Sequence, residues 1–269
     1  MLIGQVIWNP DEVIADLGFF ELRYYSLCFA LAFASCYFIL KHRLRKLQVS
    51  VELLDTLTVY VFIGTLTGAR LAHCLFYDFS YFSEHPLEIF LPVSFEPDFH
   101  FTGYRGLASH GGGVGIILSL LLFSRKYRIN LWFLLDQISL VVPLAGFFIR
   151  IGNLMNSEII GKPANVPWAF IFVKEDRLPR HPAQLYEAFS YLLLFWLLQR
   201  LAKKQIRQHG YYFGLLFVLL FTIRILIEFV KEVQSSFESN MILDMGQLLS
   251  VPFIIVGMCI LFSKRKLMR

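Results

Sequence analysis

Seven long apolar blocks constrain this chain more than any other feature of its sequence. Windows of about 19 residues place them at 22–40, 53–77, 106–123, 131–150, 183–199, 211–230 and 246–262. At a helical rise of ~1.5 Å per residue, each block is long enough to cross the hydrocarbon core of a bilayer. Only 17% of the residues are charged, against about 25% in soluble proteins. The sequence therefore excludes a soluble globular protein and predicts an all-α polytopic membrane protein with seven transmembrane helices.

The distribution of Lys and Arg between the blocks predicts the orientation. Fifteen basic residues fall in one set of connections, 41–51, 124–130, 200–210 and the tail after 262, and six fall in the other set. Because cytoplasmic loops are enriched in Lys and Arg, the N-terminus is expected outside and the C-terminus in the cytoplasm. The net charge of +5 is explained by topology, and no nucleic-acid partner is expected.

The connections also predict the domain organisation. No repeat or linker divides the chain, so residues 1–269 are expected to form a single transmembrane domain. The outer connections 79–105 and 154–182 are the only ones long enough to form a cap, which predicts a small outer head. All four cysteines fall inside spans, where Cys behaves as a small apolar residue, and neither a disulfide nor a metal cluster is expected.

Ionisable residues inside the predicted spans gather toward the outer leaflet. Each costs about 2.5–3.5 kcal/mol on insertion scales and therefore requires a partner, a wet cavity or a function. One interpretation is structural pairing and snorkelling, with Arg224 and Glu228 neutralising each other one turn apart. The other is that a surplus of guanidinium binds the phosphate of a phospholipid headgroup through its bidentate fork. We expect such a headgroup site, and five spans contribute to it: Arg70, His110, Arg150, Glu187, and Arg224 with Glu228.

A glycine-rich run follows His110 at the start of the third block. Four of the five residues 111–115 are Gly, which lets backbone and ligand come close, and a helix N-terminus there would favour phosphate. Close helix packing by small residues is the commoner use of such a run. The histidine in it is either a catalytic group or a structural residue at the membrane interface.

Polar residues also collect where the fourth block ends and the fifth begins. Arg150, Asn153 and, one turn further, Asn156 or Glu158 would share one face if the helix continues. A capped helix end, where Asn and Gly are ordinary, is the alternative. At the next block, Pro182 suits a helix start, and Gln184 and Glu187 share a face.

Short motifs on the seven blocks, taken in order, resemble the prolipoprotein diacylglyceryl transferase family over nearly the whole chain. No one motif is specific, but seven in order are. Departures from the family pattern are Ile149 and Ser157, where Gly is usual, and Tyr24 and Ser26, where Trp and Gly are usual. The motifs are Leu22-Arg23-Tyr24-Tyr25-Ser26-Leu27, Gly68-Ala69-Arg70-Leu71, His110-Gly111-Gly112, Arg150-Ile151-Gly152-Asn153 with Asn156, Glu158 and Gly161, His181-Pro182-Ala183-Gln184-Leu185-Tyr186-Glu187, Arg224 with Glu228, and Gly246-Gln247-Leu248-Leu249-Ser250.

The resemblance implies an activity and a location. The activity is transfer of the diacylglyceryl group from phosphatidylglycerol to the lipobox cysteine thiol of a bacterial prolipoprotein. This reaction forms a thioether, releases glycerol phosphate and is the first step of lipoprotein maturation. The implied location is the bacterial cytoplasmic (inner) membrane, with a multi-pass chain and an active site toward the outer leaflet. No cofactor or metal is implied.

The resemblance also implies residue roles. Arg150 and Arg224 would stabilise the charge that grows on the phosphate as the C–O bond breaks. His110 would accept the thiol proton or hold a headgroup oxygen, since reference pKa values are about 6.5 for His and about 8.5 for Cys. The implied substrate-binding residues are Tyr25, Arg70, Asn153, Glu158, Gly161 and Glu228.

Two other functions fit parts of the pattern. A metal-dependent phosphatidyl-group transferase or lipid phosphatase needs several carboxylates on one face, whereas Asp55 and Asp136 lie at the inner side and the outer acids are dispersed. A lipid or anion transporter could also use buried Arg. However, the ionisable residues stay in one leaflet, and the internal repeat often seen with alternating access is not visible.

Overall fold

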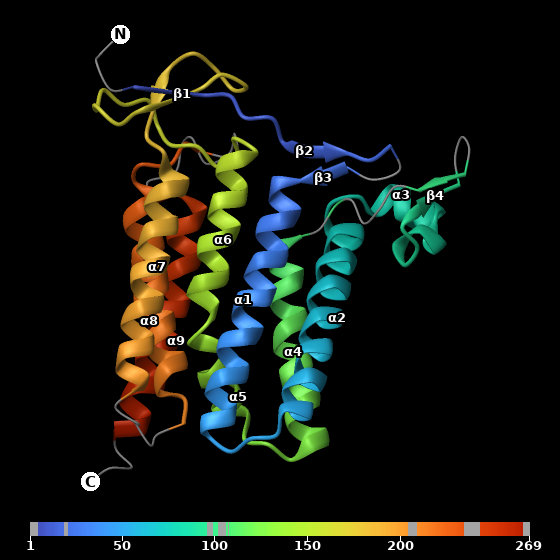
Figure 1. The fold of residues 1–269 in the computed structure, drawn as a ribbon, viewed down its shortest axis with the longest axis vertical. Coiled ribbons are helices and arrows are strands. Elements are labelled where there is room, and N and C mark those ends of the chain that lie inside the picture. Colours follow the sequence, from blue (N-terminus) through green and yellow to red (C-terminus); the bar gives the residue numbers. More distant parts are fainter. Residues whose placement is uncertain are drawn as a thin grey trace. The chain divides into compact units, whose positions relative to one another are not determined.

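The computed structural model describes residues 5–18, 21–95, 99–101, 106, 108–203, 209–233 and 243–265, with only the backbone at 100, 101, 109, 110, 264 and 265. Most of these residues are helical (Figure 1). The helices are α1 (Tyr24–Lys46), α2 (Val51–Phe76), α3 (Phe79–Glu84), the 3₁₀ helix η1 (Pro86–Ile89), α4 (Ser109–Tyr127), α5 (Leu131–Ser139), α6 (Val142–Met155), α7 (Ala183–Ala202), α8 (Tyr211–Glu228) and α9 (Met245–Arg265).

Each of the seven predicted apolar blocks contains one or two of these helices, which confirms the prediction of a mostly helical membrane protein. Four helices, α1, α2, α8 and α9, are long and apolar enough to cross a membrane. The pair α5 and α6, which meet at a bend of 44°, makes a fifth span if it is counted as one. For α4 and α7 the crossing stays a prediction, as does the orientation of the chain.

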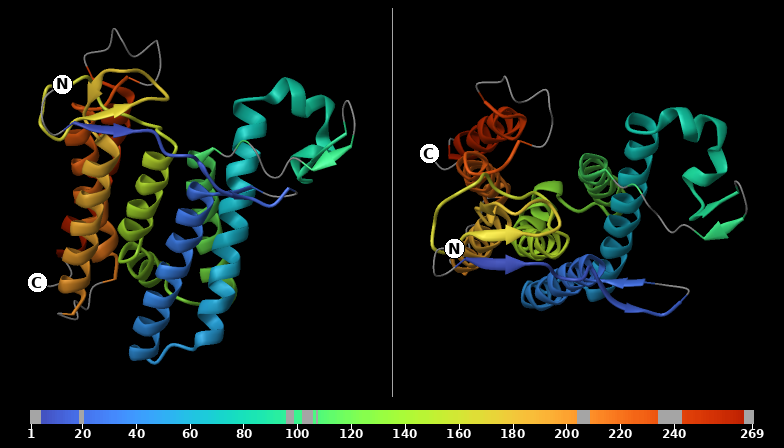
Figure 2. Two further views of the ribbon diagram at one scale, coloured as in Figure 1. Left: turned by 45° about the horizontal axis from the view of Figure 1, so that its top comes forward. Right: turned by 90° about the horizontal axis from the view of Figure 1, so that it is seen from above.

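The chain divides into two compact units. Met1–Leu40 and Leu135–Arg269 form the first unit, and Lys41–Leu134 form the second. In the first unit, α6 packs against α7, α7 against α8, and α8 against α9 (Figure 2). In the second unit, α2 packs along α4.

An apolar cluster and a buried carboxylate hold the first unit together at one end of its helices. Asp136 of α5 accepts hydrogen bonds from the backbone N–H of Gly210 (2.6 Å) and Phe213 (2.9 Å). These N–H groups at the start of α8 have no partner within the helix, so the carboxylate fixes where α8 begins. The adjoining core cluster joins α7 to α8 and contains Leu140, Leu194, Leu198, Ala202, Tyr212 and Leu216.

Short strands build a head on the first unit. The strands β1 (Val6–Trp8), β6 (Phe170–Phe172) and β7 (Pro179–Arg180) form a sheet in the order β1-β6-β7, with β1 parallel to β6 and β7 antiparallel to it. The strands β2 (Val13–Asp16) and β3 (Glu21–Arg23) form an antiparallel pair. The predicted outer connection 154–182 supplies β6 and β7, and the N-terminal segment, which was not predicted to join the head, supplies β1. The other predicted connection, 79–105, belongs to the second unit. Trp8 anchors the N-terminal segment, because its indole N–H donates to the carbonyl of Leu154 (2.8 Å).

Glycines allow close packing in the second unit. A Cβ on Gly68 would overlap the carbonyl of Gly111, and a Cβ on Gly115 would overlap the carbonyl of Gly64. Small residues at such a crossing let two helix backbones approach closely. Beyond α2, the segment of α3, η1, β4 (Val93–Ser94) and β5 (His100–Phe101) forms an arm.

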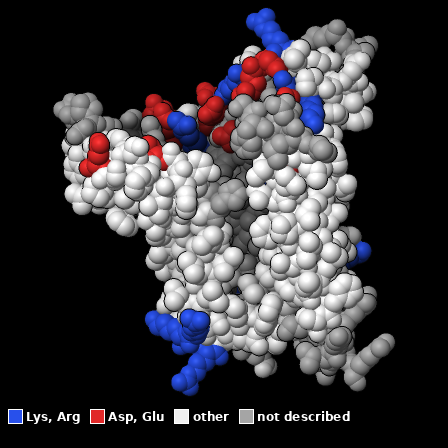
Figure 3. All heavy atoms as spheres, turned by 180° about the vertical axis from the view of Figure 1, so that it is seen from behind, with Lys and Arg blue, Asp and Glu red and all other residues white. Residues whose placement is uncertain are grey.

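The surface of each unit suits an apolar surrounding. In the face drawn in Figure 3, the sides of the helices are largely free of charged atoms, which gather near helix ends. Large apolar side chains such as Phe38, Phe62, Leu193 and Phe262 are exposed on these sides. An exposed apolar belt of this kind is typical of helices in contact with lipid.

Candidate active site

An ion pair between α6 and α7 forms the centre of the site in the first unit. The guanidinium Nε of Arg150 lies 2.5 Å from Oε2 of Glu187. The Glu187 side chain is 0% exposed and that of Arg150 is 12% exposed. Breaking a buried ion pair by removing one partner costs about 3–5 kcal/mol where the remaining charge finds no other partner. The pair therefore fixes the direction in which the guanidinium points.

A chain of hydrogen bonds runs from Arg150 into the loop after α6. Nη1 of Arg150 donates to Oδ1 of Asn153 (2.9 Å), and Nδ2 of Asn153 donates to Oε2 of Glu158 (2.9 Å). Asn156 donates to the other carboxylate oxygen of Glu158 (3.0 Å), and Gln184 donates to its backbone carbonyl (2.6 Å). The helix does not continue as the shared-face interpretation required, because α6 ends at Met155 with Asn156 as its C-cap, which is the alternative of a capped helix end. Hydrogen bonds nevertheless link Arg150, Asn153 and Glu158.

The backbone on either side of Glu158 is strained. Ser157 and Ile159 both have φ of +57°, in the left-handed region. A residue with a Cβ pays about 1–2 kcal/mol there, whereas glycine does not. Ser157 is one of the positions where the family pattern usually has Gly, so this chain holds a strained turn where glycine would be relaxed.

Tyr25 packs onto the same cluster from the first turn of α1. A Cβ on Gly152 would lie 2.9 Å from Cδ2 of the Tyr25 ring, so the glycine allows the ring to approach α6. The Tyr25 hydroxyl interacts electrostatically with both Arg150 and Glu158. Tyr25 therefore lies beside the groups that link Arg150 to Glu158.

A second chain of charges extends from Glu187 to α9. Nζ of Lys231 lies 3.2 Å from Oε1 of Glu187 and 3.1 Å from Oε2 of Glu228. The carboxyl group of Glu228 lies against Gly246 in the first turn of α9, where a Cβ would be 2.5 Å from its Cδ. A helix N-terminus favours a negative charge. Glu228 is therefore held by Lys231 and α9, and its ion-pair partner is not Arg224.

Arg224 is the arginine that the cluster leaves without a partner. It is half-buried on α8 and has no hydrogen bond or ion pair with any residue that the structure describes. Tyr191, one turn after Glu187, contacts Oε1 of Glu187 (3.4 Å), and its hydroxyl interacts electrostatically with Arg150 and Arg224. The sequence predicted more than one buried arginine without an acidic partner. Within the first unit only Arg224 fits that prediction among the described residues of the cluster, because Arg150 is paired with Glu187.

Gly161 is a crossing point between the head and the end of α8. It forms an isolated β-bridge with Lys231, and a Cβ on it would lie 2.6 Å from the Cβ of His181. Its carbonyl accepts a hydrogen bond from Nη1 of Arg180 (3.0 Å). The predicted site residue Gly161 thus sets the backbone next to Lys231.

Arg180 joins the head to the segment that follows α8. Its guanidinium contacts Asp176 through Nη2 (2.6 Å) and Glu232 through Nη1 (2.7 Å). These hydrogen bonds hold the pKa of Asp176 below its usual range and raise the pKa of Arg180. Both groups therefore stay charged near neutral pH and keep the segment after α8 tied to the head.

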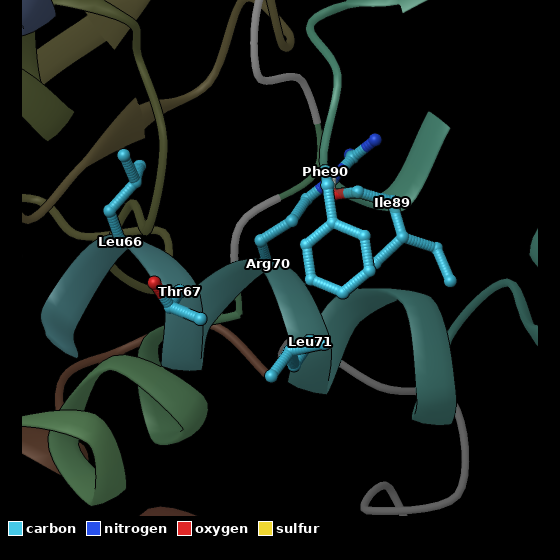
Figure 4. A pocket seen from close by; sticks show the side chains of 6 residues that line it. All are labelled: Leu66, Thr67, Arg70, Leu71, Ile89 and Phe90. Carbon is cyan, nitrogen blue, oxygen red and sulfur yellow. Dashed lines mark hydrogen bonds between the residues drawn. The ribbon is translucent and has the colours of Figure 1, made fainter. Parts of the chain in front are cut away.

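Arg70, in the second unit, organises the arm (Figure 4). Its Nη2 donates to the carbonyl of Glu88 (2.6 Å) and its Nε to that of Ile89 (3.2 Å). The guanidinium also lies 4.7 Å from the ring centroid of Phe82, in cation–π range. Glu88 in turn accepts a hydrogen bond from the backbone N–H of Phe95 (2.8 Å), which lowers its pKa. These contacts of Arg70 are with the arm.

The backbone of His110 belongs to the first turn of α4, and its side chain lies outside the described residues. For the glycines that follow it, the structure favours the packing interpretation at Gly111 and Gly115, which contact α2. A Cβ on Gly113 would meet nothing within 4 Å. In the described part of the chain, no three His, Cys, Asp or Glu residues are grouped so that they could hold a metal ion.

Glu187 was predicted to contribute to the headgroup site, whereas no role was predicted for Lys231 or Tyr191. Lys231 follows Glu228 by three residues, a helical spacing that could have linked them, but the apolar block ends at 230 and the lysine was counted with the loop. Tyr191 follows Glu187 by four residues, and the surrounding apolar run hides this spacing.

Comparison with known proteins gives consistent matches. Residues 12–263 match the sequence model of a family described as prolipoprotein diacylglyceryl transferase. The chain is 44% identical over 265 residues to a Bacteroides fragilis protein named phosphatidylglycerol–prolipoprotein diacylglyceryl transferase, covering 97% of this chain and 96% of that protein. A Tolumonas auensis protein of the same name is 40% identical, covering 97% of this chain and 98% of that protein. For a third, from Chloroherpeton thalassium, the values are 36%, 98% and 96%.

Proposed function

The chain belongs to the prolipoprotein diacylglyceryl transferase family, and we propose that it transfers the diacylglyceryl group of phosphatidylglycerol to the lipobox cysteine of a prolipoprotein. The substrates are then a membrane lipid and the signal-peptide region of a bacterial lipoprotein precursor. The product is a thioether-linked lipid on the cysteine, and glycerol phosphate is released.

The observation that carries this proposal is the difference between the partners of two arginines, Arg150 and Arg224. Arg150 has a fixed direction, because Glu187 and Asn153 hold two of its nitrogens. Arg224 has no carboxylate partner among the described residues. Binding a phosphate requires a cation that is not already neutralised, and a site of low dielectric strengthens the attraction. Arg224 meets this requirement, and Arg150 supplies an oriented second guanidinium.

The chemistry follows from these two groups. The cysteine thiol loses its proton, and the sulfur attacks the glycerol carbon that bears the phosphate ester. A C–S bond forms as the C–O bond breaks, and the electron pair leaves with the phosphate oxygen. Guanidinium groups stabilise that growing negative charge most when they are already in place, and one such donor is worth about 10²–10³ in rate. Arg150 and Arg224 are proposed to fill this role.

The remaining predicted site residues support the two arginines. His110 is proposed to take the thiol proton or to hold a headgroup oxygen. Asn153 and Glu158 orient Arg150 and the headgroup through their hydrogen-bond chain. Tyr25 covers the same groups from α1.

Gly161 and Glu228 are proposed to shape the binding site through Lys231, which both of them contact. Arg70 is proposed to contribute to binding of the lipid substrate, in addition to its contacts with the arm.

The proposed location is the bacterial inner membrane, with the head and the Arg150 end facing outside. Two observations support this orientation. Fifteen Lys and Arg fall in the connections predicted to be cytoplasmic. The head's ion pairs Lys174–Glu12, Arg180–Asp176 and Arg180–Glu232 join residues that all lie in the predicted outer connections.

The direct test is mass spectrometry of a lipobox peptide incubated with purified protein and phosphatidylglycerol. The expected result is a mass increase of one diacylglyceryl group on the cysteine, with release of glycerol phosphate in equal amount. A peptide with Ser in place of the lipobox Cys is the matched control and should stay unmodified. Absence of the adduct with an intact, monodisperse protein would refute the proposed function.

A further inference from the structure

Lys231 is a buried lysine that bridges two carboxylates. It lies just past the end of α8, is 4% exposed, and contacts Glu187 (3.2 Å) and Glu228 (3.1 Å) with the same ammonium nitrogen. Its backbone is fixed by the β-bridge to Gly161 and by the neighbouring hydrogen bonds Lys162 N–H to Val230 C=O (2.8 Å) and Glu232 N–H to Ile160 C=O (3.0 Å). The ammonium is therefore held in place from both its backbone and its side chain.

Charge balance in the cluster depends on this lysine. Glu187 and Glu228 are matched by Arg150 and Lys231, which leaves Arg224 outside the balance. Without the charge of Lys231, two carboxylates would share one paired cation. Glu228 would then have Arg224 one turn back on α8, at the spacing where opposite charges on a helix meet.

We propose that Lys231 is a positioning residue that keeps Glu228 from neutralising Arg224 and so leaves Arg224 available to the lipid phosphate. This inference rests on the proposed function. Lys231 would then strengthen phosphatidylglycerol binding indirectly, by keeping the charge of Arg224 available, although the two side chains share no observed contact.

The test compares the effect of Lys231→Gln in two backgrounds. Equilibrium binding of a fluorescent phosphatidylglycerol is measured on the purified full chain, with and without Arg224→Gln. In the native background, Lys231→Gln should weaken binding about tenfold or more, the scale of one charge-assisted hydrogen bond. In the Arg224→Gln background it should cause no further loss, because the group through which it acts is absent.

Matched variants separate positioning from loss of structure. Lys231→Arg, which keeps the charge, should recover most of the affinity. Lys162→Gln is the control, because Lys162 belongs to the same segment but donates to the backbone carbonyl of Phe229 (3.1 Å) rather than to a carboxylate; its binding should be unchanged. If Lys231→Gln is not recovered as folded protein, Lys231→Met repeats the comparison.

The outcomes are distinct. Equal losses from the Lys231 substitution in both backgrounds would show a general structural role and overturn the inference. Native affinity in Lys231→Gln would overturn it as well, while leaving the proposed function in place. A native chain that binds no phosphatidylglycerol and forms no thioether would refute both.

Discussion

Arg150→Lys tests whether a guanidinium fork, rather than a positive charge alone, is needed at the site. Arg150 forms an ion pair with Glu187 through Nε (2.5 Å) and donates a hydrogen bond to Asn153 through Nη1 (2.9 Å), so it contacts two groups on different elements. A lysine ammonium is a single point and cannot meet both groups and a phosphate in this geometry. We expect the rate of thioether formation to fall about 10²–10³-fold, which corresponds to about 2.7–4 kcal/mol of transition-state stabilisation.

The structure also predicts that this variant folds. Glu187 keeps Lys231 as a cation partner at 3.2 Å, so its buried carboxylate is not left uncompensated. The assay is mass spectrometry of the lipobox peptide, with membrane levels of the protein measured by immunoblot. Arg177→Lys, on an exposed residue of the head loop, is the matched control and should be nearly silent. Near-native turnover of Arg150→Lys at normal membrane level would refute the requirement for a guanidinium fork and would show that the role of Arg150 is structural.

Three further predictions follow from packing, topology and the absence of a metal cluster in the described residues. Gly246→Ala should impair transfer, because its Cβ would lie 2.5 Å from Cδ of Glu228, whereas Gly113→Ala meets nothing within 4 Å and should be tolerated; equal activities would contradict this. In a cysteine-free background, Ser83→Cys should react with an impermeant thiol reagent from outside and Lys203→Cys only after permeabilisation; the reverse pattern would overturn the orientation. Transfer should persist in EDTA, and a stoichiometric metal in the purified active protein would contradict that expectation.

The helices could be predicted from the sequence because a long apolar block in hydrocarbon must satisfy its own backbone hydrogen bonds, and a helix does so. The link between Arg150, Asn153 and Glu158 was also predictable, since helical spacing puts the first two on one face. Glu158 joins them although α6 ends at Met155, because the turn through Ser157 brings its carboxylate back to Asn153. Local spacing therefore predicted one half of the site.

The other half depends on contacts between residues far apart in the sequence. Lys231 reaches Glu187 because its backbone pairs with Gly161, and no local pattern encodes that bridge. The strand β1 has three residues, too few for an alternating pattern, and is defined by its partner β6. The pairing of Glu228 with Lys231 has a local spacing of three residues, but the preference for Lys231 over Arg224 follows from where the chain turns after α8.

Placing Arg224 in an apolar span costs energy, and the pairing of Glu228 with Lys231 connects this cost to function. An unpaired arginine inside a span costs about 2.5–3.5 kcal/mol on insertion scales, and a salt bridge with Glu228 one turn away would reduce that cost. The structure instead commits Glu228 to Lys231 and to the N-terminus of α9. A bound phosphate would supply the missing negative charge, and the charge that grows on its oxygens in the transition state would be stabilised further. Arg224 has no carboxylate partner among the described residues, and the binding and reaction of phosphatidylglycerol would offset the cost of this arrangement, which a structural ion pair with Glu228 could not do.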